Sequence, residues 1–320
     1  MKALITGGSG FIGAALLERL SREAGFELRA AVRRPIPEAV AGVTYVRVAE
    51  LGPNTAWGDA LGDSEVVVHT AARVHVMNDA AGDPLAEYRR TNVEGTLGLA
   101  RQAVSAGVRR FVFLSSIKVN GEGTPLGQPY RADDRPAPAD PYGVSKLEAE
   151  NGLRQLLRGT GTELVVIRPV LVYGPGVKAN FLTMMRWVRR GLPLPLANVH
   201  NKRSLVALDN LVDLILACCV HPAASDEIFL AADGEDLSTS ELLRRIGAAM
   251  NRRARLFPAP IAALRTAAAL AGQRGIAQRL FGSLQVDVSK ARARLQWAPP
   301  VSVDEALRRT ARHYLGTLQR

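Results

Sequence analysis

The first half of the chain alternates short apolar runs, rich in β-branched residues, with longer stretches of helical periodicity. The runs typical of buried strands lie at 3–6, 28–32, 44–48, 65–70, 110–114 and 163–168. Helical patterns separate several of them, at 11–22, 84–106 and 141–158. Strands that alternate with helices favour right-handed βαβ crossovers, which place helices on both faces of a parallel sheet. We therefore predict an α/β fold built on a Rossmann-type doubly wound parallel sheet.

A glycine-rich turn joins the first predicted strand to the first predicted helix, with the order Gly7-Gly8-Ser9-Gly10-Phe11-Ile12-Gly13. Gly7 permits a tight turn, Gly10 lets the backbone approach a pyrophosphate, and Gly13 lets the helix lie close to the strand. The free N–H groups at the start of the helix, around Phe11 and Ile12, favour an anion. A P-loop is excluded because no Gly-Lys-Ser/Thr follows. The turn therefore predicts a dinucleotide site.

The end of the second predicted strand is basic where an NAD site usually carries an acid. An Asp or Glu at this place binds the ribose 2′-hydroxyl, whereas this strand ends in Val32-Arg33-Arg34. Arg33 can bind a 2′-phosphate through two hydrogen bonds, and a charge-assisted hydrogen bond contributes about 1.5–3 kcal/mol. We therefore predict an NAD(P) cofactor, with NADP(H) favoured over NAD(H). The alternative is that both arginines point to solvent.

Two further dipeptides follow predicted strands on the expected cofactor side. Glu50 and Leu51 come after the third strand, where an acid could bind the adenine amino group and an aliphatic side chain could cover the ring. Ala71 and Ala72 come after the fourth strand, where small residues let the backbone pass close to the cofactor. We include all four in the predicted cofactor site.

The regular alternation weakens beyond residue 169, which suggests a second unit. The chain has 320 residues, enough for about two domains. We predict a dinucleotide-binding domain at 1–169, with 201–228 packing back on it. Residues 170–200 carry loop signals, and 229–320 are helical and rich in Ala and Arg. These two segments are predicted to form a smaller, mainly helical C-terminal lobe that binds the substrate.

A tyrosine and a lysine lie four residues apart at the start of a predicted helix. Asp140 and Pro141 suit the N-cap and first turn, so Tyr142 and Lys146 would share one helical face. A nearby ammonium, with the positive ring of an oxidised nicotinamide, would lower the pKa of the phenol toward neutrality. Ser116 follows the fifth predicted strand at the carboxyl edge of the sheet. We expect it to share a substrate oxygen with Tyr142.

These residues join a wider pattern that resembles the extended short-chain dehydrogenase/reductases, in particular the nucleotide-sugar epimerase/dehydratase group. The pattern comprises the glycine turn, His69-Thr70-Ala71-Ala72, Asn92 within 90–96, Ser115-Ser116, Tyr142 with Lys146, Arg168-Pro169, 172–175 and 203–209. The resemblance covers nearly the whole chain.

The resemblance implies roles for individual residues. Ser116, Tyr142 and Lys146 would be the catalytic set. Asn92 and Pro169 would belong to the cofactor side, with Asn92 also supporting the catalytic set. Two residues, Asn180 and Arg203, would hold the diphosphate of a UDP-sugar, and Arg279 is the candidate for the family's other diphosphate arginine. Arg73 and His75 would contact the sugar. The alternative for His75 is that it packs against the following helix.

The resemblance also limits the reaction. Sugar-nucleotide 4,6-dehydratases carry Thr-Asp-Glu after the fifth strand, whereas this chain has Ser116-Ile117-Lys118 and lacks the acid pair. Arg33 suits an exchangeable NADPH, and 72–79 with 116–121 look similar to the C4 reductases that form UDP-N-acetylquinovosamine for bacterial surface polysaccharide. We therefore expect 4-keto reduction at C4 of a UDP-hexose. The alternative is a UDP-sugar 4-epimerase with tightly bound NAD, and a third reading is a non-catalytic NADP(H) sensor.

Charge and composition restrict the partners. The chain has 41 Lys and Arg against 30 Asp and Glu, which favours phosphorylated ligands, but no basic block is interleaved with aromatic residues, so nucleic acid is not expected. No apolar stretch reaches 18 residues, so we expect no integral membrane association. The Ala-, Leu- and Arg-rich run 261–284 could lie on an anionic membrane, but more often such a run covers a substrate.

The remaining expectations concern compartment, metal and assembly. The chain starts at the first predicted strand, so no leader is expected, and its two adjacent cysteines offer neither a disulfide framework nor a four-ligand metal site. We therefore expect a cytoplasmic protein without a metal. The resemblance implies a homodimer in which helices 84–106 and 141–158 pair with their copies.

Overall fold

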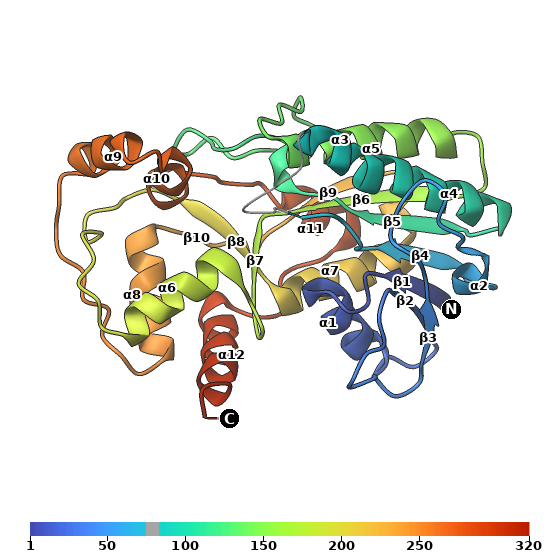
Figure 1. Ribbon diagram of the computed structural model, residues 1–320, viewed down its shortest axis with the longest axis horizontal. Helices are drawn as coiled ribbons and strands as arrows, with labels where there is room; N and C mark the ends of the chain where they lie inside the picture. The colour runs from blue at the N-terminus through green and yellow to red at the C-terminus, as the bar shows by residue number, and fades with distance from the viewer. Residues whose placement is uncertain (75–82, 320) are drawn as a thin grey trace.

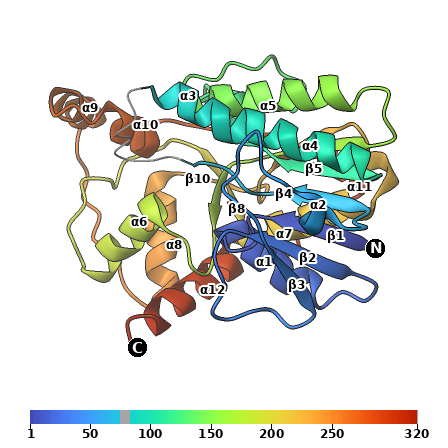
Figure 2. The ribbon, with the colours of Figure 1, turned by 45° about the vertical axis from the view of Figure 1, so that its right-hand side comes forward.

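A seven-stranded parallel sheet forms the centre of the computed structural model, which describes residues 1–74 and 83–319 (Figures 1 and 2). The strand order is β3-β2-β1-β4-β5-β6-β9. The strands are β1 Lys2–Thr6, β2 Glu27–Val32, β3 Val43–Arg47, β4 Val66–His69, β5 Arg110–Leu114, β6 Glu163–Pro169 and β9 Ile228–Ala231. All neighbours pair in parallel. The predicted α/β doubly wound fold is confirmed.

Helices cover both faces of this sheet (Figures 1 and 2). On one face α1 (Phe11–Leu20) packs against α7 (Leu208–Val220), and on the other α4 (Gly95–Ser105) packs against α5 (Pro141–Leu157). Each face has its own apolar core. The short helices α2 (Gly58–Leu61) and α3 (Pro84–Tyr88) accompany the second face.

The central strands are buried along their whole length. Every residue of β4 is buried, because β1 and β5 flank the strand and helices lie above and below it. This explains the unbroken valines of 66–68, which serve both faces at once. The sheet runs outward in two directions from β1 and β4, so their carboxyl ends border the topological switch point where doubly wound folds bind ligands.

The helix between β4 and β5 contains one irregular stretch. A π-helical turn at Arg89–Glu94 separates α3 from α4. Such turns occur mostly as single insertions in α-helices, and frequently at functional sites. Asn92 lies within this turn, and its side chain is buried.

A second core lies beside the large sheet, in the lobe at the left of Figure 1. Its small sheet has the order β10-β8-β7, formed by β10 Asp236–Leu237, β8 Arg203–Ala207 and β7 Leu171–Tyr173. Three helices surround this core: α6 Ala179–Arg189, α8 Thr239–Ala249 and α12 Val303–Gly316. Two more, α9 (Ile261–Leu270) and α10 (Arg274–Phe281), project at the far end of the lobe (Figures 1 and 2).

The C-terminal part returns to the large sheet, which the sequence did not indicate. β9 is the seventh strand, and α11 (Ser289–Leu295) packs against it. The residues Ile-Phe-Leu-Ala of β9 form a short apolar run, which periodicity alone cannot assign to a strand or a buried helix. The predicted domain limits stay a prediction, although 228–231 and 289–295 lie beside the large sheet.

None of the helices in the described ranges is both long and apolar enough to cross a bilayer.

Candidate active site

The glycine turn fits tightly against the segment that follows β4. Gly7 has a φ of 70°, and a Cβ on it would lie 2.9 Å from the backbone nitrogen of Ala71. A Cβ on Gly13 would lie 2.3 Å from the carbonyl oxygen of Gly7. Both positions therefore require glycine for the backbone itself. The Thr70 hydroxyl donates to the Thr6 carbonyl over 2.6 Å, which holds the ends of β1 and β4 together.

The start of α1 offers unpaired backbone donors at this switch point. Gly10 is the N-cap, has no side chain to cap the helix, and is exposed. Phe11 and Ile12 open the first turn, which contains no acidic residue. Free N–H groups and the positive end of the helix dipole suit a pyrophosphate, so the residues present fit a dinucleotide.

The ribose side of the site is basic, as the sequence predicts. Arg33 and Arg34 follow β2, are exposed, and line a cavity of about 460 Å³ next to Gly8 and Ser9. Glu38 also lines this cavity, so it holds two guanidinium groups and one carboxylate. The structure thus places Arg33 beside the glycine turn.

The two residues predicted to hold the adenine differ in their surroundings. Glu50 is exposed, and its carbonyl oxygen accepts a hydrogen bond from Thr55. Leu51 is buried against the start of α4, where a Cβ on Gly95 would lie 2.9 Å from the leucine Cγ. Leu51 therefore packs into the core, and its contact with an adenine stays a prediction. Ala72 lies partly exposed beside the glycine turn.

Helix α5, which carries Tyr142 and Lys146, begins as the sequence predicts. The Asp140 carboxylate caps α5 by accepting from the Gly143 backbone over 2.7 Å, and Pro141 takes the first position. Tyr142 and Lys146 then follow one turn apart. Lys146 is 2 % exposed, and its Nζ lies 4.2 Å from the centre of the Phe113 ring. A cation–π contact in a dry site partly compensates the ammonium for lost water.

Burial shifts both pKa values at this pair away from those of the free side chains. It lowers the pKa of Lys146 to about 7, and the carboxylate of Glu150 partly opposes this. Burial also raises the pKa of Tyr142 above its usual range, helped by Asp140 and opposed by a hydrogen bond with Ser116. The predicted lowering of the Tyr142 pKa requires a bound oxidised nicotinamide as well as the ammonium, so it stays a prediction. Without the cofactor, desolvation of the phenolate is the largest effect and raises this pKa. A lower pKa would need the positive charge of the nicotinamide.

Ser116 lies at the carboxyl end of β5, next to the phenol. Its backbone is extended, and its Oγ accepts from the Lys118 backbone nitrogen over 3.3 Å. The Ser116 side chain is near enough to the phenol to lower the pKa of Tyr142, although burial outweighs this effect. The structure therefore assembles Ser116, Tyr142 and Lys146 as the sequence predicts, with their catalytic roles still a prediction.

Asn92 fastens the segment after β4 to α5. Its Oδ1 accepts from the Arg73 backbone nitrogen over 2.8 Å, and its Nδ2 donates to the Arg73 carbonyl over 3.0 Å. The same Nδ2 donates to the Ser145 hydroxyl over 3.1 Å. Ser145 precedes Lys146, so Asn92 positions both walls of the site from the π-helical turn.

Aromatic contacts link Arg73 to the phenol. The Arg73 guanidinium lies 5.8 Å from the centre of the Tyr88 ring. That ring in turn meets the Tyr142 ring edge-on, with 6.0 Å between centres. Arg73 is thereby held near the Tyr142 ring, and its contact with a sugar stays a prediction. His75, the other predicted sugar contact, lies outside the described residues.

The predicted diphosphate residues are only partly brought together. Arg203 lies on β8, where its Nη1 donates to the Gly282 carbonyl over 3.1 Å. Burial lowers the pKa of Arg203, and the charge of Arg279 lowers it further, so the two guanidinium groups lie close to each other. Asn180 is exposed in the first turn of α6, and no contact in the described part of the chain joins it to Arg203. Pro169 is buried at the end of β6.

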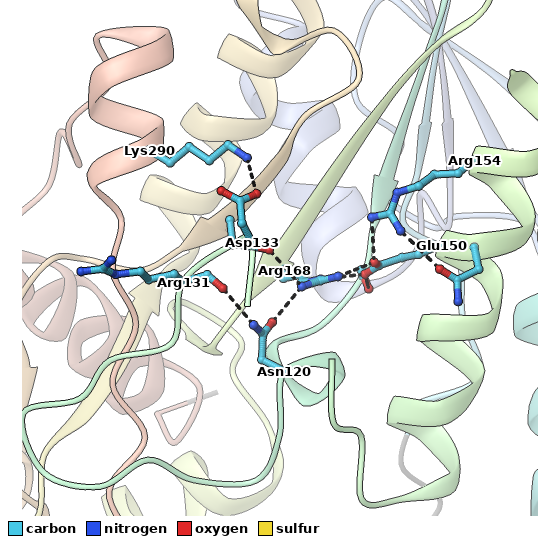
Figure 3. A network of polar contacts seen from close by, with 10 residues as sticks. Asn120, Arg131, Asp133, Glu150, Arg154, Arg168 and Lys290 are labelled. Carbon is cyan, nitrogen blue, oxygen red and sulfur yellow. Dashed lines mark hydrogen bonds and ion pairs between the residues drawn. The ribbon is translucent and has the colours of Figure 1, made fainter. Parts of the chain in front are cut away.

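A buried ion pair behind the catalytic set was not identified from the sequence (Figure 3). Glu150, one turn beyond Lys146, is 0 % exposed, and Arg168 on β6 is 1 % exposed. Arg168 donates to both oxygens of this carboxylate, over 2.9 and 2.6 Å. Ser115 donates to Glu150 over 2.6 Å, and Asn120 accepts from Arg168 over 3.0 Å. The pair thus ties α5 to β6, and the Ser115 hydrogen bond ties α5 to the end of β5, where Ser116 follows.

A buried histidine also supports the strand ends. His69 lies between the hydroxyls of Thr6 and Thr96, at 2.7 and 2.9 Å. Burial, together with the charge of Lys146, lowers the pKa of His69 to about 3, so its ring is neutral in ordinary buffers. The sequence does contain a signal for this role, since a histidine in the predicted buried strand of β4 needs hydrogen-bond partners. Within the described residues no group of three His, Cys, Asp or Glu could hold a metal ion.

Replacing Lys146 by Met should make the folded protein more stable. The pKa of Lys146 is about 7 in the folded protein against 10.5 for the free group, so the unfolded chain binds this proton more tightly. Wild-type stability should then rise from about pH 7 to about pH 10.5, and the Met variant should lack this rise. At pH 7 we expect a gain of about 2–4 kcal/mol in the free energy of unfolding, measured by urea denaturation. Lys178→Met, at an exposed position, is the matched control, and equal slopes with pH in all three proteins would refute the expectation.

Comparisons with known proteins show what the whole chain is similar to. A model of the NAD dependent epimerase/dehydratase family matches residues 3–232. The chain is 44 % identical to a UDP-glucose 4-epimerase of Vibrio cholerae, over 98 % of this chain and 95 % of that one. It is 30 % identical to a dTDP-L-rhamnose 4-epimerase of Burkholderia thailandensis, over 77 % and 80 % of the two chains.

A solved structure has the same fold over the whole length. MoeE5 in complex with UDP-glucose and NAD superposes with a TM-score of 0.79 at 25 % identity, covering 99 % of this chain and 100 % of that one. These likenesses fit the epimerase alternative better than 4-keto reduction, and the C4 reductase branch stays a prediction.

Proposed function

From its membership of the NAD dependent epimerase/dehydratase family, which the match over residues 3–232 establishes, we propose that this chain is a 4-epimerase of a UDP-hexose. It is a nucleotide-sugar enzyme of the short-chain dehydrogenase/reductase type. The proposal is carried by one observation: Tyr142 lies one helical turn before the buried Lys146 on α5, with Ser116 at the carboxyl end of β5, at the same edge of the sheet as the glycine turn. The 44 % identity with the Vibrio cholerae epimerase supports the reaction and the UDP-sugar.

The chain's own residues would move one proton in each direction. The bound nicotinamide would supply a hydride acceptor and a positive charge near the phenol. Tyr142 would take the proton of the C4 hydroxyl as the carbinol becomes a 4-keto group, and return it when the hydride adds to the opposite face. Ser116 would hold the same oxygen. Burial keeps the Tyr142 phenol protonated in the protein alone, so the base would form only beside a positive cofactor.

The site does not suit a 4,6-dehydratase. The two residues after Ser116 would have to carry an acid and a base for loss of water from C5 and C6. Ile117 is buried in the apolar core, and Lys118 pairs with Asp140 and Glu122. Neither can replace the acid pair.

The UDP part of the substrate would lie between the large sheet and the lobe residues of β8 and α10. Arg203 and Arg279 are close enough for one charge to lower the pKa of the other, and a diphosphate would relieve that repulsion. Asn180 at the uncapped start of α6 would complete the anion site. Arg73, held by Asn92 and Tyr88, would contact the hexose.

The direct test is interconversion of UDP-glucose and UDP-galactose, or of their N-acetylated forms, by the purified chain without added cofactor. Products are separated by anion-exchange chromatography, and we expect an approach to the same equilibrium from both sides. No interconversion, together with oxidation of NADPH by a UDP-4-keto sugar, would replace the proposal with the second candidate, a C4 reductase. That candidate is favoured by Arg33 and the missing acid after β2.

We expect Arg33→Ser to lower the affinity for NADPH about ten- to a hundredfold, because one charge-assisted contact with the 2′-phosphate is lost. Affinity for NADH should change little. Fluorescence titration of both nucleotides measures this, and Arg34→Ser is the matched control on the same loop. A wild-type chain that binds NADH more tightly than NADPH would show that Arg33 does not select the phosphate.

A homodimer through α4 and α5 remains part of the proposal, and sedimentation velocity of the purified chain tests it.

A further inference from the structure

The positive charge of the chain is concentrated in two segments. Residues 164–208 and 242–286 contain none of the 30 Asp and Glu but 15 of the 41 Lys and Arg. The rest of the chain therefore carries 26 basic residues against 30 acidic ones and is net negative. A field of one sign over part of a surface points to a partner of opposite sign.

Parts of the two segments lie side by side on the lobe. The backbone nitrogen of Leu194 donates to the Arg255 carbonyl over 2.9 Å, and that of Phe257 donates to the Leu194 carbonyl over 3.0 Å. Figures 1 and 2 place this loop pair, and α9 after it, on the side of the lobe away from the large sheet. We name the loops 190–197 and 251–260, with α9 and the first turn of α10, the outer edge; the end of α10, which carries Arg279, is not part of it.

Apolar side chains of the outer edge face solvent. Helix α9 has no buried residue, although five of its ten residues are alanine and three more are Ile or Leu. Leu270 at its end is 84 % exposed, Phe257 46 % and Ile276 41 %. A ten-residue helix is marginal in water by itself and usually depends on packing of its apolar face. An exposed apolar surface of this kind marks a place of interaction.

Exposed arginines lie on the same two loops and on α9. They are Arg190, Arg252, Arg253, Arg255 and Arg265. Among the residues that the structure describes, none of these guanidinium groups pairs with a carboxylate, whereas Arg245 on α8 pairs with two. Guanidinium groups that are unpaired within the fold are available to phosphate groups of a partner.

We propose that the outer edge docks on the anionic face of a lipid bilayer. The arginines would lie on lipid phosphates, while Leu270, Phe257 and Ile276 enter the boundary between headgroups and acyl chains. Basic residues with interspersed apolar ones on a short helix are the pattern of an interfacial segment. Nucleic acid fits less well, because stacking on bases needs aromatic side chains and the exposed set has one. The inference does not depend on the C4 chemistry.

The test is co-sedimentation of the full chain with lipid vesicles. Vesicles of equal phosphatidylcholine and phosphatidylglycerol are compared with pure phosphatidylcholine in about 0.1 M salt. We expect binding to the anionic vesicles at least tenfold tighter than to the neutral ones. Equal or absent binding to both would overturn the proposal.

Two variants locate the surface. Arg252→Glu, Arg253→Glu and Arg255→Glu together should lower vesicle binding at least tenfold. The matched control changes Arg158, Arg292 and Arg312 to Glu, because these are also exposed, lie elsewhere and have no carboxylate partner in the described ranges. It alters the net charge equally and should keep vesicle binding. If both triple variants lost vesicle binding equally, the binding would depend only on the net charge of the chain, and the proposal would be overturned.

A third variant separates a bilayer from other polyanions. Leu270→Ser with Ile276→Ser leaves the charge unchanged and should weaken vesicle binding severalfold, because apolar side chains no longer enter the membrane. Circular dichroism melting and dinucleotide binding should match the wild type in every variant. Tighter binding to duplex DNA than to the vesicles, or vesicle-free self-association lost in the Glu variant, would assign the outer edge to nucleic acid or to a second copy instead.

Discussion

Replacing Tyr142 by Phe is expected to lower turnover of a UDP-hexose about 10²–10⁴-fold, the usual contribution of a positioned general acid–base group. The ring would stay in place, because it packs edge-on against Tyr88 and lies in the first turn of a capped helix. The phenol hydroxyl alone is lost, and with it the hydrogen bond to Ser116. Turnover is measured by chromatography of the UDP-sugars and cofactor binding by fluorescence titration.

Tyr88→Phe is the matched control, since it removes a phenol hydroxyl from the neighbouring ring without touching the proposed acid–base group. It should keep activity within a few-fold of the wild type. Cofactor affinity should be unchanged in both variants. If Tyr142→Phe retained full turnover, the proton would have to move through another group, and the proposed mechanism would be wrong.

The second large effect is expected on stability. Arg168→Met should lower the free energy of unfolding by about 3–5 kcal/mol, because it leaves the Glu150 carboxylate buried without its main partner. The hydrogen bond that Asn120 accepts from Arg168 would be lost as well (Figure 3). The one that Ser115 donates to Glu150 would be disturbed. Urea denaturation followed by circular dichroism measures the change.

Two further variants interpret this loss. Arg168→Met combined with Glu150→Met should recover most of the stability, since an apolar pair of similar volume avoids the unpaired charge. Arg89→Met removes an exposed ion pair, in which the Arg89 guanidinium lies 2.6 Å from Glu148, a residue of α5 like Glu150. It should lower the free energy of unfolding by about 0–1 kcal/mol. A similar loss in the free energy of unfolding for Arg89→Met and Arg168→Met would mean that burial does not increase the contribution of the Glu150–Arg168 pair to stability.

Much of the fold follows from local sequence patterns. The unbroken valines of β4 and the glycine turn before α1 predict a central parallel strand and a strand–turn–helix unit, and the structure contains both. These elements can be predicted because the conformation of each depends mainly on residues adjacent to it in the sequence. β9 was not predicted because its four consecutive apolar residues show no periodicity that distinguishes a strand from a helix. They form a strand because they pair with the otherwise open edge of β6.

For the site, too, the sequence predicted the local arrangement of residues but not the contacts between distant elements. Helix spacing placed Tyr142 and Lys146 on one turn, and the structure adds Ser116 as expected. The direction of the Tyr142 pKa shift could not be predicted, because it depends on how much water the folded protein removes from the phenol. The Glu150–Arg168 pair joins residues eighteen positions apart on different elements, and spacing along one helix cannot identify such a partner.

The path of the chain around β9 has a consequence for how this protein can be dissected. The backbone leaves the large sheet after β6, forms β7, α6 and β8, comes back for β9, and departs again for β10 and α8. No single cut can therefore release an intact half: truncation after residue 169 strips the outermost strand from the sheet, and the excised remainder keeps a strand with nothing to pair with. Fragment complementation, with the two pieces expressed together, is the arrangement under which either portion should be recovered in native form.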